Sequence, residues 1–335
     1  MYYKILFIMS LMTGTLISIS AYSWMGMWMG LEINLLSIIP LMSSTNDMTS
    51  SEATLKYFIT QTLASTILLF SIILSSIDFS NNLNFNMYIS LIYSTSLLTK
   101  MGAAPFHFWF PEVMEGLNWF NSIIMLTWQK IAPMILIMYS NKNTLYFIIV
   151  IIVSMLISGI MGINQTSLRK ILAYSSINHI GWMMSAIMIS TTIWAYYFMI
   201  YTIITINIIM ILWMLNIFHM NQLYISLNEN PMIKFFFMMN FLSLGGLPPF
   251  LGFMPKWILI NSLIQSNFYF IAFLMTIMTL MTLYFYMRIT FSTMLLSKMQ
   301  INYYLTPKIK LNLIMSSNFI MLVSLIMITI SINFN

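Results

Sequence analysis

Apolar runs of about 20 residues recur along the chain and limit its possible folds more than any other feature. An α-helix of roughly that length crosses the hydrocarbon core of a bilayer. Hydrophobic residues fill 60% of the 335 positions and charged residues 6%, whereas about 25% of the residues in a soluble domain are charged. No water-soluble fold can bury so much apolar surface. The sequence therefore predicts an all-α, polytopic membrane protein.

Polar residues, Pro and Gly divide the chain into eleven predicted spans, within one transmembrane domain covering residues 1–335. Thr49 and Glu52 have the spacing of a capping box, and Glu52 and Lys56 that of an i,i+4 ion pair, which predicts a well-marked start for the third span. The spans are residues 5–22, 24–42, 52–76, 87–110, 119–139, 144–163, 168–189, 191–218, 232–263, 268–291 and 311–334.

The distribution of basic residues predicts the orientation, because loops that are translocated across a membrane avoid Lys and Arg. With eleven crossings, the N-terminus and every even-numbered connection lie on one side. Nine basic residues belong to that side and one, Lys142, to the other. The nine are Lys4, Lys56, Arg169, Lys170, Lys234, Arg288, Lys298, Lys308 and Lys310. The N-terminus is thus expected to face the cytoplasm-equivalent compartment, which is the matrix if the membrane is mitochondrial.

Two spans contain helix-breaking sequences in their interiors. The fourth contains Gly102 to Pro105, and the ninth contains Gly245 to Pro249. Broken helices at membrane depth are tolerated where they face protein or a watery cavity. Because the breaks are five helices apart, we expect two inverted five-helix repeats, residues 5–139 and 144–291, and one extra C-terminal helix at residues 311–334.

Ionisable residues inside the spans are the strongest functional signal. Glu32, Lys100, Lys130 and Lys256 lie well inside spans, and His179 lies mid-helix. Each Glu or Lys costs about 2.5 to 3.5 kcal/mol at the bilayer centre. Burial disfavours their charged forms and brings them toward a range in which protons are exchanged. These five residues are therefore candidate steps in a proton path.

Simpler readings remain open for several of these residues. Glu32 could pair with a lysine only to hold helices together, although three lysines exceed one glutamate. The polar patch around His179 could serve interhelical hydrogen bonding, and His107 could be an interfacial packing residue. Glu112 and Glu115 could collect protons at an entrance or be solvated charges at the membrane rim.

Other function classes lack support in the sequence. There is no Cys, which excludes disulfides and cysteine-ligated Fe–S clusters or zinc sites on this chain. The three His residues never approach a metal-ligand spacing, so no metal is expected. The net charge of +6 is scattered and forms no basic stripe for nucleic acid, and nucleotide-binding and hydrolase motifs do not occur.

Five segments, in their order and spacing, resemble the chain 2 family of mitochondrial NADH:ubiquinone oxidoreductase, in an insect-type version. This is one of the antiporter-like subunit families of respiratory complex I. The resemblance covers nearly the whole chain. The segments are residues 29–36, 100–109, 128–130, 168–176 and 244–250.

The resemblance implies a proton-translocating core subunit of the membrane arm. Glu32 and Lys100 correspond to the pair of the proton-input half-channel, Lys130 to the central lysine, Lys256 to the residue on the second broken helix, and His179 to a polar-axis histidine. No cofactor is expected on this chain, because flavin, Fe–S clusters and ubiquinone would belong to other subunits. The chain lacks three N-terminal helices of the full-length pattern, which makes accessory subunits expected partners.

The resemblance also implies a setting, namely the mitochondrial inner membrane, with the N-terminus in the matrix and the C-terminus in the intermembrane space. Other membrane-arm subunits and phospholipids, including cardiolipin, are expected partners. Two alternatives of different classes remain: a free-standing cation/proton antiporter, and a purely structural scaffold. Intact buried charges argue against the scaffold.

Overall fold

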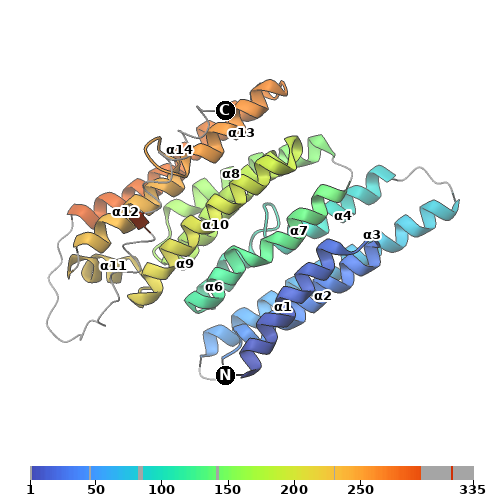
Figure 1. The fold of residues 1–335 in the computed structure, drawn as a ribbon, viewed down its shortest axis with the longest axis horizontal. Helices are drawn as coiled ribbons and strands as arrows, with labels where there is room; N and C mark the ends of the chain where they lie inside the picture. The colour runs from blue at the N-terminus through green and yellow to red at the C-terminus, as the bar shows by residue number, and fades with distance from the viewer. Residues whose placement is uncertain are drawn as a thin grey trace. The chain divides into compact units, whose positions relative to one another are not determined.

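A computed structural model describes residues 2–44, 47–81, 86–140, 143–229, 231–295 and 318–319. Apart from an isolated bridge between Ser167 and His219, the regular elements of these residues are helices. They form two compact units, an N-terminal unit of residues Met1–Ser154 and a C-terminal unit of residues Met155–Asn335 (Figure 1). The elements are α1 (Tyr2–Ser20), α2 (Trp24–Met42), α3 (Met48–Asn81), α4 (Asn86–Met101), α5 (Trp109–Gly116), α6 (Trp119–Leu126), α7 (Trp128–Tyr139), α8 (Thr144–Ile163), α9 (Leu168–Ile189), α10 (Thr191–Met214), α11 (Met220–Ser226), the 3-10 turn η1 (Leu227–Glu229), α12 (Pro231–Gly245), α13 (Phe253–Gln265) and α14 (Tyr269–Leu295).

In the N-terminal unit, α1 packs along α2, α2 along α3, and α3 against both α4 and α5, while α4 also packs against α7. Small residues allow α1 and α2 to approach closely: a Cβ on Gly30 would lie 2.5 Å from the Ser18 amide nitrogen. Close approach through small residues is the usual basis of helix association in lipid, where no hydrophobic effect drives helices together. This packing holds α2, with Glu32, against α3.

The start of α3 confirms one prediction and corrects another. Lys56 pairs with Glu52 at 3.0 Å, as the i,i+4 spacing predicts, and also with Glu112 of α5 at 2.9 Å. The predicted capping box is wrong, because α3 begins at Met48 and Thr49 already lies inside its first turn. The second ion pair connects α3 to the segment that follows the first break.

Both predicted helix breaks are present, and each begins with the same helix-ending motif. After α4, the Ala103 amide donates to the Leu98 carbonyl and Gly102 adopts a φ of 71°. After α12, the Leu247 amide donates to the Leu242 carbonyl and Gly246 adopts a φ of 80°. A bond spanning five residues around a left-handed glycine is the Schellman motif. Both breaks therefore end a helix cleanly inside a predicted span.

The fifth predicted span contains an interruption that the sequence analysis did not anticipate. Thr127 separates α6 from α7, and its hydroxyl donates to the Ile123 carbonyl at 2.7 Å. Such back-bonding bends helices, and Pro133 removes a further amide donor from α7. As a result, Lys130 lies in the first turn of α7 instead of in mid-helix.

In the C-terminal unit, α9 is the central helix, and α10, α13 and α14 all pack against it. It is buried along nearly its whole length, which explains how a helix can carry Asn178 and His179 in its middle. The predicted span 191–218 ends early, with α10 at Met214, and the connection that follows contains α11 and η1.

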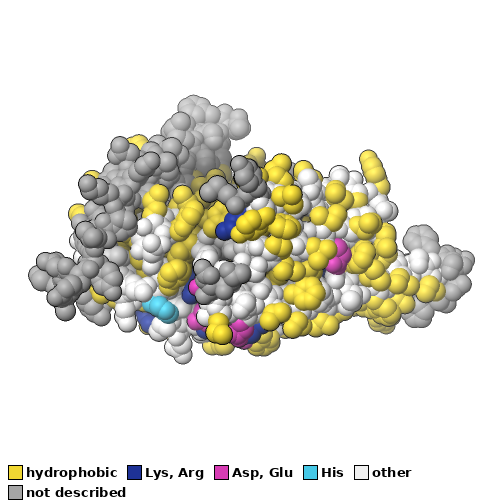
Figure 2. Space-filling view, turned by 90° about the horizontal axis from the view of Figure 1, so that it is seen from below, with side chains coloured by type: hydrophobic (Ala, Val, Ile, Leu, Met, Phe, Trp, Pro, Cys, Tyr) yellow, Lys and Arg dark blue, Asp and Glu magenta, His cyan; other side chains and the backbone are white. Residues whose placement is uncertain are grey.

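Seven helical segments of the described residues are long and apolar enough to cross a membrane. The two broken spans and the polar α9 are not among them, because the breaks shorten the first two and polar side chains such as Asn178 and His179 lower the hydropathy of the third. Hydrophobic side chains occupy much of the coloured surface in Figure 2, and the visible charged side chains are few. This surface is suited to lipid. The predicted C-terminal helix at residues 311–334 lies outside the described residues apart from residues 318–319.

Candidate functional site

Lys100 occupies the last turn of α4, directly before the first break, with 7% of its surface exposed. The ending of α4 leaves carbonyl groups without helical partners. Side chains satisfy two of them: Gln61 donates to the Lys100 carbonyl at 3.2 Å, and Trp109 donates to the Thr99 carbonyl at 3.1 Å. The break is thus a polar site inside the N-terminal unit.

Glu32 lies on α2 and interacts electrostatically with Lys100 and Tyr57. One carboxylate oxygen, Oε1, is buried without a hydrogen-bond partner. Within the part of the chain that the structure describes, no ion pair joins Glu32 directly to Lys100. Glu32 and Lys100 therefore interact through space without an ion pair, and their role as a pair in proton input stays a prediction.

Uncharged polar side chains that the sequence analysis missed share a cavity with Lys100. Gln129 donates to the Asn34 side-chain oxygen at 2.8 Å, and both residues line a small cavity together with Tyr57, Gln61 and Lys100. The cavity leaves about 10 Å³ for the centre of a water molecule, close to the room that one water requires. Asn34 and Gln129 are each within two residues of a predicted site residue, and that proximity was the available signal.

Lys130 is 1% exposed and belongs to the same unit. Its Nζ lies 5.8 Å from the centre of the Phe110 ring, a residue of α5. Its neighbour Gln129 lines the cavity that contains Lys100. The N-terminal unit thus contains Glu32, Lys100 and Lys130, of which Lys100 lines the cavity and Lys130 faces the Phe110 ring.

Lys256 lies in the first turn of α13, on the far side of the second break, and is 7% exposed. Its Nζ donates to the Gly245 carbonyl at 2.7 Å and the Leu244 carbonyl at 3.3 Å, so the side chain reaches back across the break. A cation is favoured at the C-terminal end of a helix, which here is the end of α12. A Cβ on Gly246 would lie 2.8 Å from this Nζ, which is the movable end of a side chain, so glycine is favoured there chiefly by its φ of 80°.

His179 lies in the same unit and is 4% exposed. Its Nδ1 is 2.9 Å from the Tyr197 hydroxyl, and its ring is 4.9 Å from that of Tyr201. These three side chains share a small cavity with Ser243 and Pro255, which flank the second break. The structure therefore brings His179 to the second break, while the two tyrosines of α10 were missed because they are uncharged and common in apolar helices.

Corresponding positions of the two breaks are 144 residues apart in the sequence. Gly102 corresponds to Gly246, and Trp109, where α5 begins, corresponds to Phe253, where α13 begins. Pro105 and Phe106 correspond to Pro249 and Phe250. The Phe106 amide donates to Ala103 at 2.9 Å, and the Phe250 amide donates to Leu247 at 3.0 Å. The same offset aligns Glu112 with Lys256, so the ionisable groups are not duplicated. The backbone is not fully duplicated either, because the bond between Ala104 and Pro105 is cis and the bond between Pro248 and Pro249 is not.

The fold and these clusters define a polytopic α-helical membrane protein with ionisable side chains buried at helix breaks. The family model described as "NADH:quinone oxidoreductase/Mrp antiporter, TM" matches residues 21–282. The chain belongs to this family.

Curated relatives support the assignment at high identity. The chain is 51% identical to NADH-ubiquinone oxidoreductase chain 2 of Aedes aegypti over 332 residues, covering 97% of this chain and 96% of the relative. It is 50% identical to the protein of the same name from Anopheles gambiae over 294 residues, covering 87% of this chain and 86% of the relative. The family resemblance read from the sequence is confirmed.

Solved structures share the fold at lower identity. A chain of respiratory complex I from Thermus thermophilus superimposes with a TM-score of 0.86 at 20% identity, covering 96% of this chain and 77% of that one. A chain of the Mrp complex from Dietzia sp. gives a TM-score of 0.75 at 17% identity, covering 86% of this chain and 59% of that one. The architecture is therefore shared between a respiratory complex and an antiporter complex.

Proposed function

We propose that this chain moves protons across the membrane through Glu32, Lys100, Lys130, His179, Lys256 and the water molecules that their polar surroundings admit. The chain is an antiporter-like membrane subunit of NADH:ubiquinone oxidoreductase, respiratory complex I. Electron transfer from NADH to ubiquinone takes place on other subunits, which carry the flavin and the Fe–S clusters. This chain supplies the coupled proton movement.

One observation carries the proposal: ionisable side chains lie buried beside both helix breaks, among polar groups and water-sized cavities. Lys100 and Lys256 are each 7% exposed, and each lies beside the backbone carbonyl groups at which a helix ends, where Gln61 donates to the Lys100 carbonyl and Lys256 donates to the Gly245 carbonyl. Ionisable side chains are costly to bury in a bilayer, and membrane proteins that contain them use them mainly in ion and proton pathways. A purely structural scaffold gives no reason to bury them.

The proposal extends to the setting of the chain. We place it as a multi-pass protein of the mitochondrial inner membrane, built from two inverted repeats, with its N-terminus in the matrix and its C-terminus in the intermembrane space. Its partners are the other membrane-arm subunits, accessory subunits, and phospholipids including cardiolipin. The asymmetry of the basic residues supports this orientation.

The orientation predicts which connections are accessible from each side. The connection between α8 and α9 should be on the matrix side, because Arg169 and Lys170 follow it. A small tag inserted there should react with an impermeant reagent only in inside-out membranes, and a tag at Asn335 only in right-side-out mitochondria lacking the outer membrane. Labelling of Asn335 from the matrix would show that the number of crossings is not odd.

Replacing Glu32 with Gln tests the proton path. Gln keeps the size of the side chain but removes its charge, so proton pumping by the assembled complex should fall by roughly tenfold or more if Glu32 is a proton-transfer group. The matched control is Glu52→Gln, since the Glu52 side chain is 68% exposed and its ion pair is solvated. Normal pumping by Glu32→Gln, or an equal loss in both variants, would remove Glu32 from the path.

A further inference from the structure

Tyr197 connects α10 to His179, a residue of the proposed proton path. Its hydroxyl is hydrogen-bonded with Nδ1 of His179 at 2.9 Å, and its side chain is 2% exposed. The two residues come from packed neighbouring helices that are separated by Ser190 alone, whose side chain accepts from the Ile193 amide at the start of α10. The bond is therefore a product of the hairpin that α9 and α10 form.

A second aromatic contact holds the Tyr197 ring. This ring lies nearly parallel to that of Trp182, with ring centres 6.4 Å apart and an angle of 12° between the planes. Trp182 follows His179 by three residues on α9, so the two side chains share a face of the helix. The Trp182 ring also lies 5.7 Å from Nζ of Lys256. Tyr197 thus presents its hydroxyl to His179 from a packed ring, beside the tryptophan that Lys256 approaches.

Packing alone does not choose between the two orientations of the His179 ring. Turning an imidazole by 180° about its Cβ–Cγ bond exchanges nitrogen and carbon positions but keeps nearly the same shape. A hydrogen bond separates the two orientations, because Nδ1 bonds to the hydroxyl and the carbon that would replace it does not. The bond at one ring nitrogen also sets which nitrogen carries the proton in the neutral ring. The Tyr197 hydroxyl is therefore suited to fix both properties of His179.

We propose that Tyr197 is a positioning residue for proton transfer at His179. Its hydroxyl holds Nδ1, so the ring keeps the orientation in which it lines the small cavity at the second break together with Ser243 and Pro255. This role rests on the proposed function, because it requires His179 to exchange protons. Tyr197 acts through the ring that it holds and does not itself gain or lose a proton.

Other titratable groups face this pair from the helices that pack against α9. On α10, the Tyr201 ring lies 4.9 Å from the His179 ring. On α14, Tyr286 interacts electrostatically with Tyr197 and Tyr201. On α13, the titratable side chain is that of Lys256. Removing the Tyr197 hydroxyl leaves all three of these neighbours in place, so its effect can be assigned to the bond with His179.

A double-mutant cycle in the assembled complex tests this role. Tyr197→Phe keeps the ring and removes only the hydroxyl, so proton pumping should fall on the order of fivefold, the worth of about one hydrogen bond. The pH dependence of NADH:ubiquinone activity should change as well, whereas a merely structural role would lower activity equally at every pH. In a His179→Gln background, Tyr197→Phe should have no further effect, because the ring through which Tyr197 acts is gone.

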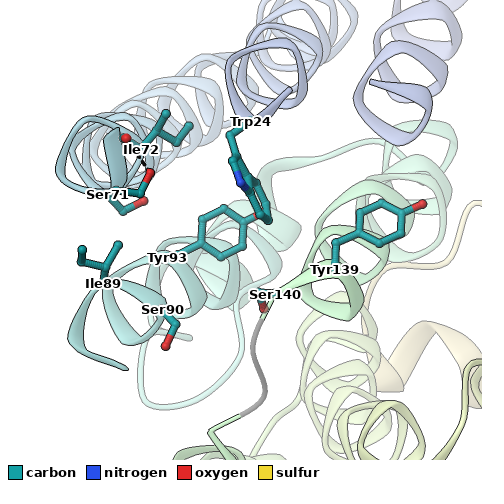
Figure 3. Close-up of a pocket in the computed structure, with 9 residues that line it drawn as sticks. Trp24, Ser71, Ile72, Ile89, Ser90, Tyr93, Tyr139 and Ser140 are labelled. Carbon is teal, nitrogen blue, oxygen red and sulfur yellow. Dashed lines mark hydrogen bonds between the residues drawn. The ribbon is translucent and has the colours of Figure 1, made fainter. Parts of the chain in front are cut away.

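Tyr93→Phe is the matched control for loss of a buried tyrosine hydroxyl. Tyr93 is 7% exposed, and its ring also packs against a tryptophan, Trp24, with ring centres 4.8 Å apart (Figure 3). Its hydroxyl has no hydrogen-bond partner in the described part of the chain. The cavity drawn beside it is lined by none of the residues of the proposed proton path. Pumping and its pH dependence should therefore be unchanged in this variant.

The outcomes separate the role of Tyr197 from the proposed function. Impaired pumping by His179→Gln with normal pumping by Tyr197→Phe would overturn the positioning role alone. An equal loss from Tyr197→Phe in both backgrounds would do the same. Normal pumping by assembled His179→Gln would remove His179 from the path, and the role of Tyr197 with it. Failure of Tyr197→Phe to assemble, while Tyr93→Phe assembles, would show that the bond serves the fold instead of proton transfer.

Discussion

Lys130→Met should leave complex I assembled and reduce both proton pumping and NADH:ubiquinone activity, on the order of 10²-fold if Lys130 is a positioned proton-transfer group. Met is unbranched, similar in length and at home in lipid, and its sulfur can keep a favourable contact with the Phe110 ring that Lys130 now faces at 5.8 Å. The packing around a side chain that is 1% exposed should therefore survive. Electron transfer should fall with pumping because the two are coupled.

Lys56→Met is the matched control for this prediction. It removes a lysine from the same unit, but the Lys56 side chain is 42% exposed and its pairs with Glu52 and Glu112 are at the surface. Surface pairs contribute roughly 0 to 1 kcal/mol each, so turnover should be close to normal. The two variants are compared by native gel electrophoresis for assembly and by NADH:quinone activity. Normal activity of assembled Lys130→Met would contradict the proposed role.

Gly252→Ala should disrupt the second break and with it the assembly of the complex. A Cβ on Gly252 would lie 1.8 Å from the Ser243 carbonyl oxygen, which is backbone of the preceding α12 and cannot rotate away. Overpacking usually costs about 1 to 3 kcal/mol and occasionally more, and a backbone obstacle places this case at the upper end. The amount of assembled complex and its thermal stability should both fall.

Gly245→Ala provides the control at the same break. There an added Cβ would be 3.6 Å from the nearest atom, Cδ2 of Tyr286, which is an ordinary contact. Assembly should be unchanged, since Ala is also the better helix former at the end of α12. Equal assembly of the two variants would show that the close approach of Gly252 to Ser243 does not hold the break together.

Much of the fold follows from local signals. The predicted limits of α2, α8 and α9 coincide with those observed, because polar residues mark both ends of these apolar runs. The breaks at Gly102 and Gly246 were predictable because proline follows each within three residues. The interruption at Thr127 was not, since it depends on a hydroxyl that bonds back to Ile123, a choice open to any threonine in a helix.

The candidate site likewise contains residues that could be predicted from the sequence and residues that could not. Its charged members were identifiable because charge in an apolar span is costly and therefore conspicuous. Gln61 was not, because a neutral amide costs less and the sequence does not tell which helix it faces. Lys256 donates to the carbonyl at the end of α12 because of the path that the chain takes through the break. The number of residues between Gly245 and Lys256 does not determine that path. The proton-transfer roles of all five residues stay predictions.

Lys130→Arg, studied in reconstituted vesicles, tests the central claim most directly. Arg keeps the positive charge but does not release its proton at accessible pH. Pumping and NADH oxidation should be measured on the same assembled sample, with Lys130→Met beside it. A proton-relay role predicts assembled complexes with strongly impaired pumping for both variants. Near-normal pumping by Lys130→Arg with defective assembly of Lys130→Met would contradict it and assign Lys130 a structural charge.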